Sequence, residues 1–378
     1  MSLELLQIHN ARNLKEYILK PHPCFNIIYG SNGVGKTTIL ESVYLLLRSR
    51  TFRSSKYKSF IHYDAQNCTV FSRFSGRCKD TENSSFTLGI SRSKDTTQPT
   101  LHLNSKKINS LSTITKLVVL GLITPESFTL LDAGPAIRRK FIDWGVFHVE
   151  PQFLSLWRSY KKIISNRNSI LKRLSIKYSN MSVVPKLELD NISCWSPQLI
   201  TLNDQLNNLR SRQIDHISPL FFQYLNKFST DLGSRITLKY YQGWSKDLSF
   251  DKYLESKLNE DLSAGTTRYG THRGELHINY NNVMAKDILS RGQKKIVVIC
   301  LILAQYHYLV VQDSSSHHNV LLLDDIDSEL DEKNLFILFE ILDSIHSQIL
   351  VTTTNQSKFD FIDNSKRKLF HVEHNSIT

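Results

Sequence analysis

Residues 25–38 read FNIIYGSNGVGKTT: an apolar strand sequence, a glycine-rich loop and the beginning of a helix. The stretch matches the phosphate-binding pattern G-x-x-x-x-G-K-[S/T] at Gly30, Gly35, Lys36 and Thr37. Glycines let successive backbone N–H groups turn toward an anion, and the helix N-terminus adds a partial positive charge. Residues 39–47 then continue at helical spacing. The stretch predicts a nucleoside triphosphate site; a glycine-rich turn before a helix is the alternative.

The loop defines the first candidate site residues. Lys36 is expected to reach the β- and γ-phosphates of ATP and to act in catalysis, and the Thr37 hydroxyl is expected to bind Mg²⁺. ATP and Mg²⁺ are therefore the expected cofactors. The residues expected to bind the nucleotide are Gly30, Ser31, Asn32, Gly33, Val34, Gly35, Lys36, Thr37 and Thr38. Arg12, a short loop before the strand, is a further candidate for a phosphate or base contact, with a surface arginine as the equal alternative.

A weaker motif, Ser290-Arg291-Gly292-Gln293, precedes the apolar helical sequence of residues 296–305. Ser290 is placed to cap that helix, and Gly292 lets the backbone approach an anion. The pattern alone is not specific. Ser290, Gly292 and Gln293 become candidate nucleotide-binding residues because an acidic strand end follows them in the chain.

That strand is Val320–Leu323, and it ends in Asp324 and Asp325. An aspartate at a strand end beside a triphosphate is suited to holding Mg²⁺, so Asp324 joins Thr37 as a predicted metal ligand. Asp325 is expected to polarise the attacking water. A buried strand that ends in an acidic turn is the alternative. A further apolar strand ends at Thr353, either as a γ-phosphate sensor or as a strand cap.

The charge of the chain suggests a partner. Lys and Arg number 47 against 35 Asp and Glu, a net charge of +12, which favours nucleic acid or an anionic membrane surface. A generally basic composition would produce the same sum. Residues 48–58 form a basic run with two aromatics, interpreted as either a nucleic-acid contact or a solvated connector.

The sequence gives only limited information on the cellular compartment and on structural metal sites. The five cysteines are scattered and form no C-x-x-C pair, which argues for a reducing compartment without structural zinc. The N-terminus does not resemble a secretion signal, and the longest apolar run, residues 296–304, is too short to cross a bilayer. A cytoplasmic protein without a membrane partner is expected. The pair His317-His318 lies in a polar loop and is interpreted as solvated.

Hydrophobic periodicity predicts an α/β protein with an inserted helical lobe. Short alternating runs over residues 68–108 indicate an antiparallel meander, and residues 117–123 a buried strand. Helical spacing begins at Pro135, and a second helical run is expected to end near Pro219. We expect a discontinuous head domain, residues 1–130 and 235–378, and a helical lobe over residues 131–234 that contains a short antiparallel hairpin.

The order of these motifs resembles the ATP-binding-cassette (ABC) ATPases, in the branch that includes the SMC proteins. Along essentially the whole chain it is similar to the RecF family of DNA replication and repair proteins. The most family-specific segments are Gly134-Pro135-x-x-Arg138-Arg139 and Gly270-Thr271-His272-Arg273. The chain departs from the family at Thr271, where proline is usual, and at Gly274 and Glu275, where paired aspartates are usual.

The resemblance implies an ABC-type head, a mixed sheet around the phosphate-loop helix with an antiparallel meander, and a weak DNA-dependent ATPase. It implies a homodimer that forms when ATP lies between one phosphate loop and the partner's Ser290-Arg291-Gly292-Gln293 motif. That dimer would clamp duplex DNA or single-strand/duplex junctions, and slow hydrolysis would release it. RecO and RecR would be partners in loading RecA.

Two other functions share these motifs. The first is the ATPase subunit of a membrane transporter, against which the helical insertion and the basic balance argue. The second is a scaffold that binds ATP without hydrolysing it, against which Lys36, Thr37, Asp324 and Asp325 argue.

Overall fold

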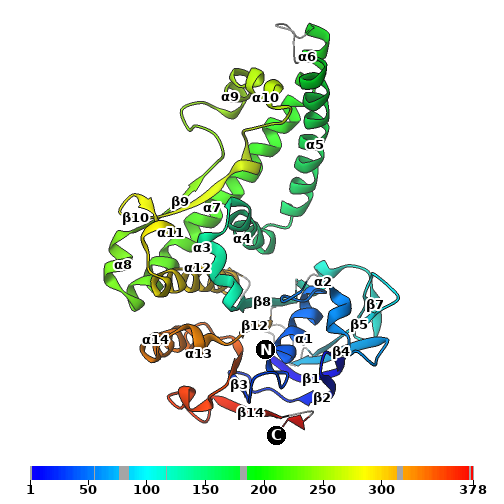
Figure 1. The fold of residues 1–378 in the computed structure, drawn as a ribbon, viewed down its shortest axis with the longest axis vertical. Coiled ribbons are helices and arrows are strands. Elements are labelled where there is room, and N and C mark those ends of the chain that lie inside the picture. The colour runs from blue at the N-terminus through cyan, green and yellow to red at the C-terminus, as the bar shows by residue number, and fades with distance from the viewer. Residues whose placement is uncertain are drawn as a thin grey trace. The chain divides into compact units, whose positions relative to one another are not determined.

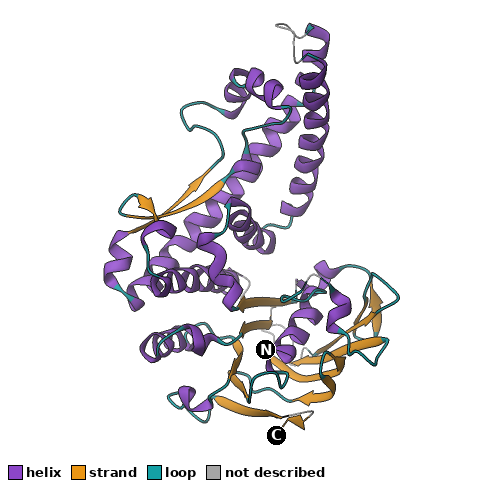
Figure 2. Ribbon diagram, viewed as in Figure 1, coloured by secondary structure: helices purple, strands orange, loops and turns teal. Residues whose placement is uncertain are grey.

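The computed structural model describes residues 2–54, 56–75, 85–115, 117–178, 185–312, 318–373 and 376–377. The chain divides into two compact units: a head unit of residues 1–128 and 291–378, and a helical unit of residues 129–290. Figures 1 and 2 show the elements of each. The described cysteines are free thiols, and Cys78 and His317 lie outside the described residues.

The head unit contains a largely parallel sheet with the strand order β15-β14-β3-β13-β12-β8. Five neighbouring strands are parallel, and only β15 pairs antiparallel. The strands are β3 (Phe25–Tyr29), β8 (Val118–Ile123), β12 (His318–Leu323), β13 (Gln348–Thr353), β14 (Arg367–Glu373) and β15 (Ser376–Ile377). Because both faces of the sheet's centre are covered, β3, β8, β12 and β13 are mostly apolar and buried along their length, whereas β14 alternates between exposed and buried residues.

A second, antiparallel sheet has the order β2-β1-β4-β5-β6-β7. Its strands are β1 (Ser2–Ala11), β2 (Leu14–Leu19), β4 (Asn67–Ser75), β5 (Phe86–Ser93), β6 (Thr100–Leu103) and β7 (Lys106–Ile108). The predicted meander is confirmed. Strand β2 was not predicted, although Leu14, Tyr17 and Leu19 are buried on it.

Helix α1 (Lys36–Arg48) packs between the two sheets. Its Ile39, Leu40 and Val43 share one core with residues of β1 and with Leu322 and Leu350 of the parallel sheet. On the opposite face of the parallel sheet lie α12 (Arg291–Gln312) and α14 (Glu332–Asp343). Phe339 of α14, for example, packs against Phe25 with ring centroids 5.6 Å apart. This arrangement fixes the start of α1 at the carboxyl end of β3.

By length and composition α12 is the one helix among the described residues that is apolar enough to cross a membrane, and most of it is buried inside the protein. The apolar run identified in the sequence, residues 296–304, is shorter than this helix because α12 also includes polar residues at both of its ends. Tyr306 of α12 packs so closely on β8 that a side chain at Gly121 would overlap it. The helix is part of the head core.

The helical unit is built on two long helices, α5 (Phe153–Lys177) and α7 (Ser196–Phe228), which pack antiparallel. Shorter helices are α3 (Thr129–Asp132), α4 (Pro135–Val149), α6 (Lys186–Ser193), α8 (Thr230–Arg235), α9 (Phe250–Ser256), α10 (Leu258–Ala264) and α11 (Ala285–Ile288). A three-stranded sheet has the order β11-β10-β9, with β9 (Ile236–Tyr241), β10 (Glu275–Tyr280) and β11 (Val283–Met284).

Residues 235–290 group with the helices, whereas the sequence analysis placed them in the head domain. Three buried ion pairs explain the difference. Arg138 pairs with Glu275 at 2.6 Å, Arg167 with Asp261 at 2.7 Å, and Arg210 with Asp143 at 2.7 Å. The first two cross from the helices to this segment, and Arg210 also donates to the carbonyl of Thr271. Glu275, a departure from the family pattern, therefore has a structural role here.

The prediction that the second long helix ends near Pro219 is wrong, because α7 continues to Phe228. A proline inside a helix removes one hydrogen bond and costs about 3 kcal/mol. Beyond it, Phe221, Tyr224 and Leu225 are buried. Burial of three large side chains at roughly 1.5–3 kcal/mol each outweighs that cost.

Candidate functional site

The loop between β3 and α1 has the backbone geometry of a phosphate-binding loop. Gly30, Gly33 and Gly35 all have positive φ, at 150°, 84° and 117°. Gly35 also allows a close approach, since a Cβ there would lie 2.5 Å from Leu14 of β2. Residues 30–35 therefore require glycine at the positions that the motif specifies.

Lys36 is the first residue of α1, and its side chain folds back over the loop. Its Nζ donates to the carbonyl oxygens of Gly30 at 2.8 Å and Ser31 at 2.9 Å. Burial lowers the pKa of this ammonium, and the nearby Asp325, Asp324 and Asp327 act in the opposite direction. The loop thus holds a positive charge where a phosphate would enter.

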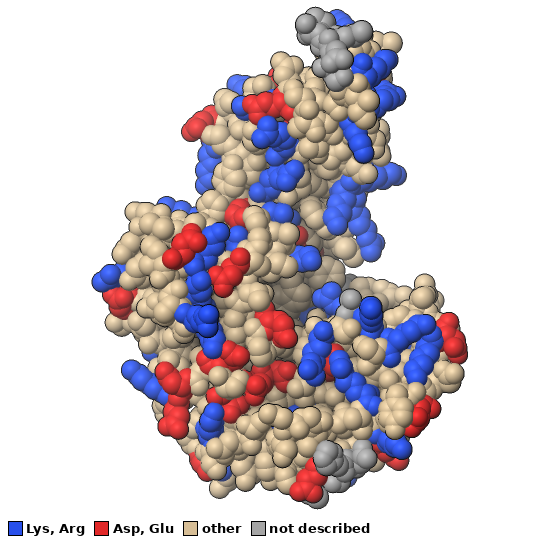
Figure 3. All heavy atoms as spheres, viewed as in Figure 1, with Lys and Arg blue, Asp and Glu red and all other residues tan. Residues whose placement is uncertain are grey.

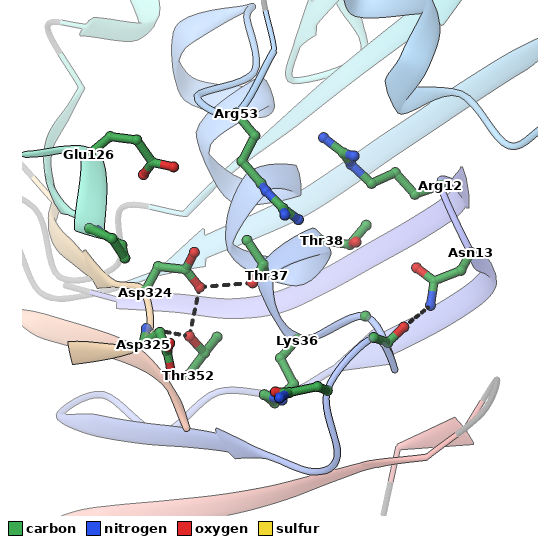
Figure 4. Close-up of a pocket in the computed structure, with 14 residues that line it drawn as sticks. Arg12, Asn13, Lys36, Thr37, Thr38, Arg53, Glu126, Asp324, Asp325 and Thr352 are labelled. Atoms are coloured by element: carbon green, nitrogen blue, oxygen red, sulfur yellow. Dashed lines mark hydrogen bonds between the residues drawn. The ribbon is translucent and has the colours of Figure 1, made fainter. Parts of the chain in front are cut away.

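Thr37 and Asp324 meet at the carboxyl edge of the parallel sheet (Figure 4). The Thr37 hydroxyl donates to Asp324 Oδ1 at 3.0 Å, and the Thr352 hydroxyl donates to the same oxygen at 2.7 Å. Burial raises the pKa of Asp324, although both hydroxyls partly offset this. The three side chains come from helix α1, from the residue directly after β12, and from β13.

These residues fit a magnesium ion. A hydroxyl and a carboxylate oxygen are hard ligands of the kind that Mg²⁺ takes, with water and phosphate oxygens completing its shell. Among the described residues no three His, Cys, Asp or Glu side chains gather as a metal site. A cation beside Thr37 and Asp324 would therefore depend on the phosphates of a bound nucleotide.

Asp325 has an unusual backbone for a non-glycine residue, with φ 53° and ψ 34°. Its N–H donates to Thr352 Oγ1 at 3.0 Å, and its carboxylate accepts from Ser328 Oγ at 2.9 Å. Such a left-handed conformation persists only where surrounding contacts hold it. These contacts turn the Asp325 side chain into the pocket rather than into the sheet.

The site is an open pocket of about 400 Å³ within the head unit. The structure brings together many of the predicted residues there, including Arg12, Lys36, Thr37 and both aspartates. Five lining residues were not assigned to the site from sequence. The full lining is Arg12, Asn13, Asn32, Gly33, Gly35, Lys36, Thr37, Thr38, Arg53, Pro125, Glu126, Asp324, Asp325 and Thr352.

Arg12 is not a solvated surface arginine. Its Nε donates to Glu41 Oε2 at 2.8 Å, and Glu41 is fully buried on α1. The other carboxylate oxygen accepts from the Arg53 N–H at 3.4 Å. Burial raises the pKa of Glu41, and the neighbouring arginines act against that rise. Glu41 therefore positions two arginines at the pocket. This residue was missed in the sequence analysis, although an acidic side chain inside an apolar helix was a signal that could have identified it.

The basic run of residues 48–58 divides between two roles. Arg53 lines the nucleotide pocket. Arg48 is partly buried and donates to the Leu120 carbonyl at 3.2 Å, and desolvation of its guanidinium lowers its pKa to about 10. Arg48 is therefore held against the head core, whereas Arg50, Lys56 and Lys58 of the same run are exposed.

Other predicted site residues lie outside the described lining of the pocket. Val34 is buried in the head core, so only its backbone belongs to the loop. Gly292 and Gln293 lie in the first turn of α12, with Ser290 directly before it. Gly292 is exposed, and a Cβ there would meet nothing within 4 Å. The motif is thus a surface feature at a helix start.

The parallel sheet with its phosphate loop, the antiparallel sheet and the strand-end aspartates together define an ABC-type ATPase head of the SMC kind. The family model described as "RecF/RecN/SMC N terminal domain" matches residues 2–378. The chain is 34% identical to the DNA replication and repair protein RecF of Pseudomonas syringae pv. tomato, over 100% of this chain and 98% of that protein. It is 35% identical to RecF of Pseudomonas aeruginosa, with the same coverage.

Solved structures show the same fold. The recombination mediator protein RecF with ATP, from the RecFOR pathway, aligns with a TM-score of 0.78 at 24% identity, over 100% of this chain and 96% of that one. An Smc head bound to the C-winged helix domain of ScpA aligns with a TM-score of 0.55 at 15% identity, over 98% and 94%. The chain belongs to the RecF family of DNA replication and repair proteins.

Proposed function

We propose that this protein is an ATP-dependent DNA-binding protein of replication and recombinational repair, and that ATP with Mg²⁺ occupies the head pocket. The observation that carries the ATP assignment is the Asp324 carboxylate, which accepts both Thr37 at 3.0 Å and Thr352 at 2.7 Å beside Lys36. In this site the loop N–H groups and Lys36 bind the β- and γ-phosphates, and Thr37 and Asp324 hold the cation. The cation offsets charge on the phosphates.

Asp325 is the residue that accepts a hydrogen bond from the attacking water, because it is next to Asp324 and faces the pocket. Hydrolysis is slow, since the strand that would carry a switch residue ends in Thr352 and Thr353, whose hydroxyls donate to Asp324 and Asp327. A hydroxyl that donates its proton to a carboxylate has no proton left to donate to the γ-phosphate or to the attacking water.

ATP also joins two copies of the chain in this proposal. The Ser290-Arg291-Gly292-Gln293 motif of one copy covers the γ-phosphate bound by the other. Its support is the exposed start of α12, where Gly292 leaves the backbone open to an anion. The homodimer forms a DNA clamp, and hydrolysis opens it.

The DNA assignment rests on α5. This helix of 25 residues carries seven Lys and Arg and no Asp or Glu. Arg167 is used in a buried pair, whereas Arg158, Lys161, Lys162 and Lys172 are exposed. Figure 3 shows basic side chains following this edge of the helical unit. A row of cations without interspersed acids is suited to a phosphate backbone.

Family membership supports the biological setting. We assign the protein to the cytoplasm, where it binds duplex DNA or single-strand/duplex junctions and acts with RecO and RecR in loading RecA. The transporter alternative is not favoured, because the curated relatives are DNA repair proteins matched over their length.

The test combines DNA binding, with and without ATP at two salt concentrations, and light scattering on the same samples. ATP-dependent dimerisation with tighter, salt-sensitive DNA binding is the expected result. Nucleotide binding that changes neither the mass nor the DNA affinity would contradict the clamp. It would leave an ATP-bound scaffold as the better description.

A further inference from the structure

A second cavity, of about 350 Å³, lies in the helical unit and has no role in the proposed ATP cycle. It is found where β9 ends and two loops, residues 242–249 and 265–274, come together. Its lining is Tyr241, Gly243, Arg268, Tyr269 and Arg273. Two aromatic rings and two guanidinium groups therefore face one space.

The floor of the cavity is made of backbone. The Gly270 N–H donates to the Gly243 carbonyl at 3.3 Å. Gly243 has φ 102°, and a Cβ there would lie 2.1 Å from the Gly270 carbonyl oxygen. The two loops thus approach too closely for a side chain at Gly243, and the shape of the cavity depends on this contact.

Both tyrosine rings are held in place. Tyr241 is 38% exposed and stacks on His277, with ring centroids 5.6 Å apart and planes at 14°. The Tyr269 hydroxyl donates to Glu260 at 2.8 Å, and its ring packs edge-on against Tyr253 at 5.1 Å. Fixed, partly exposed aromatic rings are the platforms on which proteins stack unpaired nucleic-acid bases.

The arginines supply charge for a phosphate. Arg273 is exposed, and its side chain makes no hydrogen bond or ion pair with another residue of the described chain. Arg268 lies over the Tyr269 ring at 5.9 Å and is 3.7 Å from Glu260. Glu260 is also paired with Lys257 at 2.6 Å, so the surroundings remain net positive.

The cavity is attached to the basic helix α5. The loop of residues 265–274 is anchored there by the Thr267 N–H, which donates to Asn168 at 2.8 Å, and by the Thr267 hydroxyl oxygen, which accepts from Arg167 at 2.6 Å. The cavity and the exposed lysines of α5 therefore belong to the same compact unit.

We propose that this cavity binds one unpaired nucleotide of a DNA strand, with its base on the exposed face of Tyr241 and its phosphate on Arg273. The inference rests on the proposed DNA-binding function and adds a site for the single-stranded part of a junction. Bases inside a duplex are stacked on each other and do not offer a free face to a tyrosine.

The test uses a duplex with a single-stranded tail that contains 2-aminopurine, and a blunt duplex of equal charge, both at saturating ATP. Tyr241→Ala is expected to weaken binding of the tailed DNA about tenfold, the typical loss of one stacked base, and to change blunt-duplex binding less than twofold. Tyr241→Phe keeps the ring and should restore both the affinity and the 2-aminopurine quenching.

Arg273→Ala should weaken binding of the tailed DNA in the same selective way. Arg235→Ala, which removes a similarly exposed charge from the same unit, should leave binding of the tailed DNA unchanged. Equal losses on both DNAs would make the cavity a general phosphate contact and overturn the proposal. Quenching that is lost when ATP is raised far above the concentration that saturates the head pocket would assign the cavity to free nucleotides and also overturn the proposal. If the wild-type protein binds the blunt duplex with ATP, and Tyr241→Ala binds the tailed DNA as tightly as the wild type does, only this inference fails. If the wild-type protein binds neither DNA, the proposed function fails as well.

Discussion

Glu41 shows how one buried carboxylate organises the nucleotide pocket from behind. It pairs with Arg12 at 2.8 Å and accepts from the Arg53 backbone, and neither contact involves a residue of the phosphate motif. Two arginines of the pocket wall therefore depend on a residue inside α1. Its mutation is expected to affect nucleotide binding more than folding.

Glu41→Gln is predicted to lower ATP affinity several-fold, because the amide keeps the shape but gives up a charge-assisted hydrogen bond worth roughly 1.5–3 kcal/mol. Stability should change little, since the substitution also removes a buried charge. Fluorescent-nucleotide titration and thermal melting measure the two effects. Glu16→Gln, at an exposed position, is the control; equal affinities for the two variants would show that Arg12 does not need Glu41.

Lys36→Met is predicted to abolish ATP binding without unfolding the protein. Lys36 as a residue is only 8% exposed, and burial lowers the pKa of its ammonium, so an apolar side chain of similar length suits the folded state at least as well. Isothermal titration should show no ATP binding up to millimolar concentrations. A melting temperature several degrees below wild type would indicate that the bonds to Gly30 and Ser31 support the fold.

At the scale of elements, β12 and β13 show what the sequence could and could not predict. Apolar runs that end in Asp324 and Thr353 were sufficient to predict strands and a site at their ends. The hydrogen bond from Thr352 to Asp324 was not predictable, because it depends on two strands being parallel neighbours in register. Arg53 was missed for the same reason: only folding brings it to the pocket.

His318 was wrongly interpreted as a solvated loop residue. It begins β12 and is 2% exposed, with its ring edge-on to Phe74 at 5.2 Å and Phe86 at 4.9 Å. Polar neighbours in sequence concealed this burial, since the phenylalanines lie on β4 and β5 of the other sheet.

For α5 we predict that Lys161→Ala with Lys172→Ala weakens DNA binding and reduces the slope of log affinity against log salt by about 2, one for each lost phosphate contact. The matched control is Lys106→Ala with Lys107→Ala, two exposed lysines of β7 in the head unit. Filter-binding or anisotropy at four salt concentrations measures both. If both double variants had the same slope, the weaker binding would result from the lower net charge of the protein and not from lost phosphate contacts of α5.

The loop before β10 has a pH-sensitive residue. His272 Nε2 donates to the Thr267 carbonyl at 3.0 Å, so Nδ1 accepts from the Tyr160 hydroxyl at 2.8 Å. Burial, with Arg273, Arg139 and Arg210 nearby, lowers the pKa of His272 from 6.5 to about 4. The folded state therefore holds a neutral imidazole that takes up a proton on unfolding.

Because the unfolded chain binds this proton first, stability is predicted to fall as the pH drops from 6.5 toward 4, by roughly 3 kcal/mol in all. His272→Gln, which keeps a donor and an acceptor, should flatten that part of the curve. Urea denaturation at several pH values measures it. Parallel curves for the variant and the wild type would assign the acid sensitivity to other groups.

At the scale of the whole molecule, the lifetime of the proposed dimer depends on hydrolysis, because hydrolysis of ATP opens it. Asp325→Asn is predicted to bind ATP normally and to remain a dimer, because Lys36, Thr37 and Asp324 are intact while the group that polarises water is lost. Light scattering with ATP should give twice the monomer mass, stable over hours. A variant that stays monomeric at saturating ATP would contradict the sandwich model.

The helical unit enters the chain between η2 (Pro125–Phe128) and α12, and these two segments contact each other within the head. Lys295 of α12 lies 5.9 Å from the Phe128 ring. An insertion whose two ends are neighbours can be lengthened, shortened or exchanged without disturbing the sheet around it. One ATPase head can thus acquire different appendages during evolution, and an artificial graft between residues 128 and 290, which retains Ser290, should leave the nucleotide pocket of the head intact.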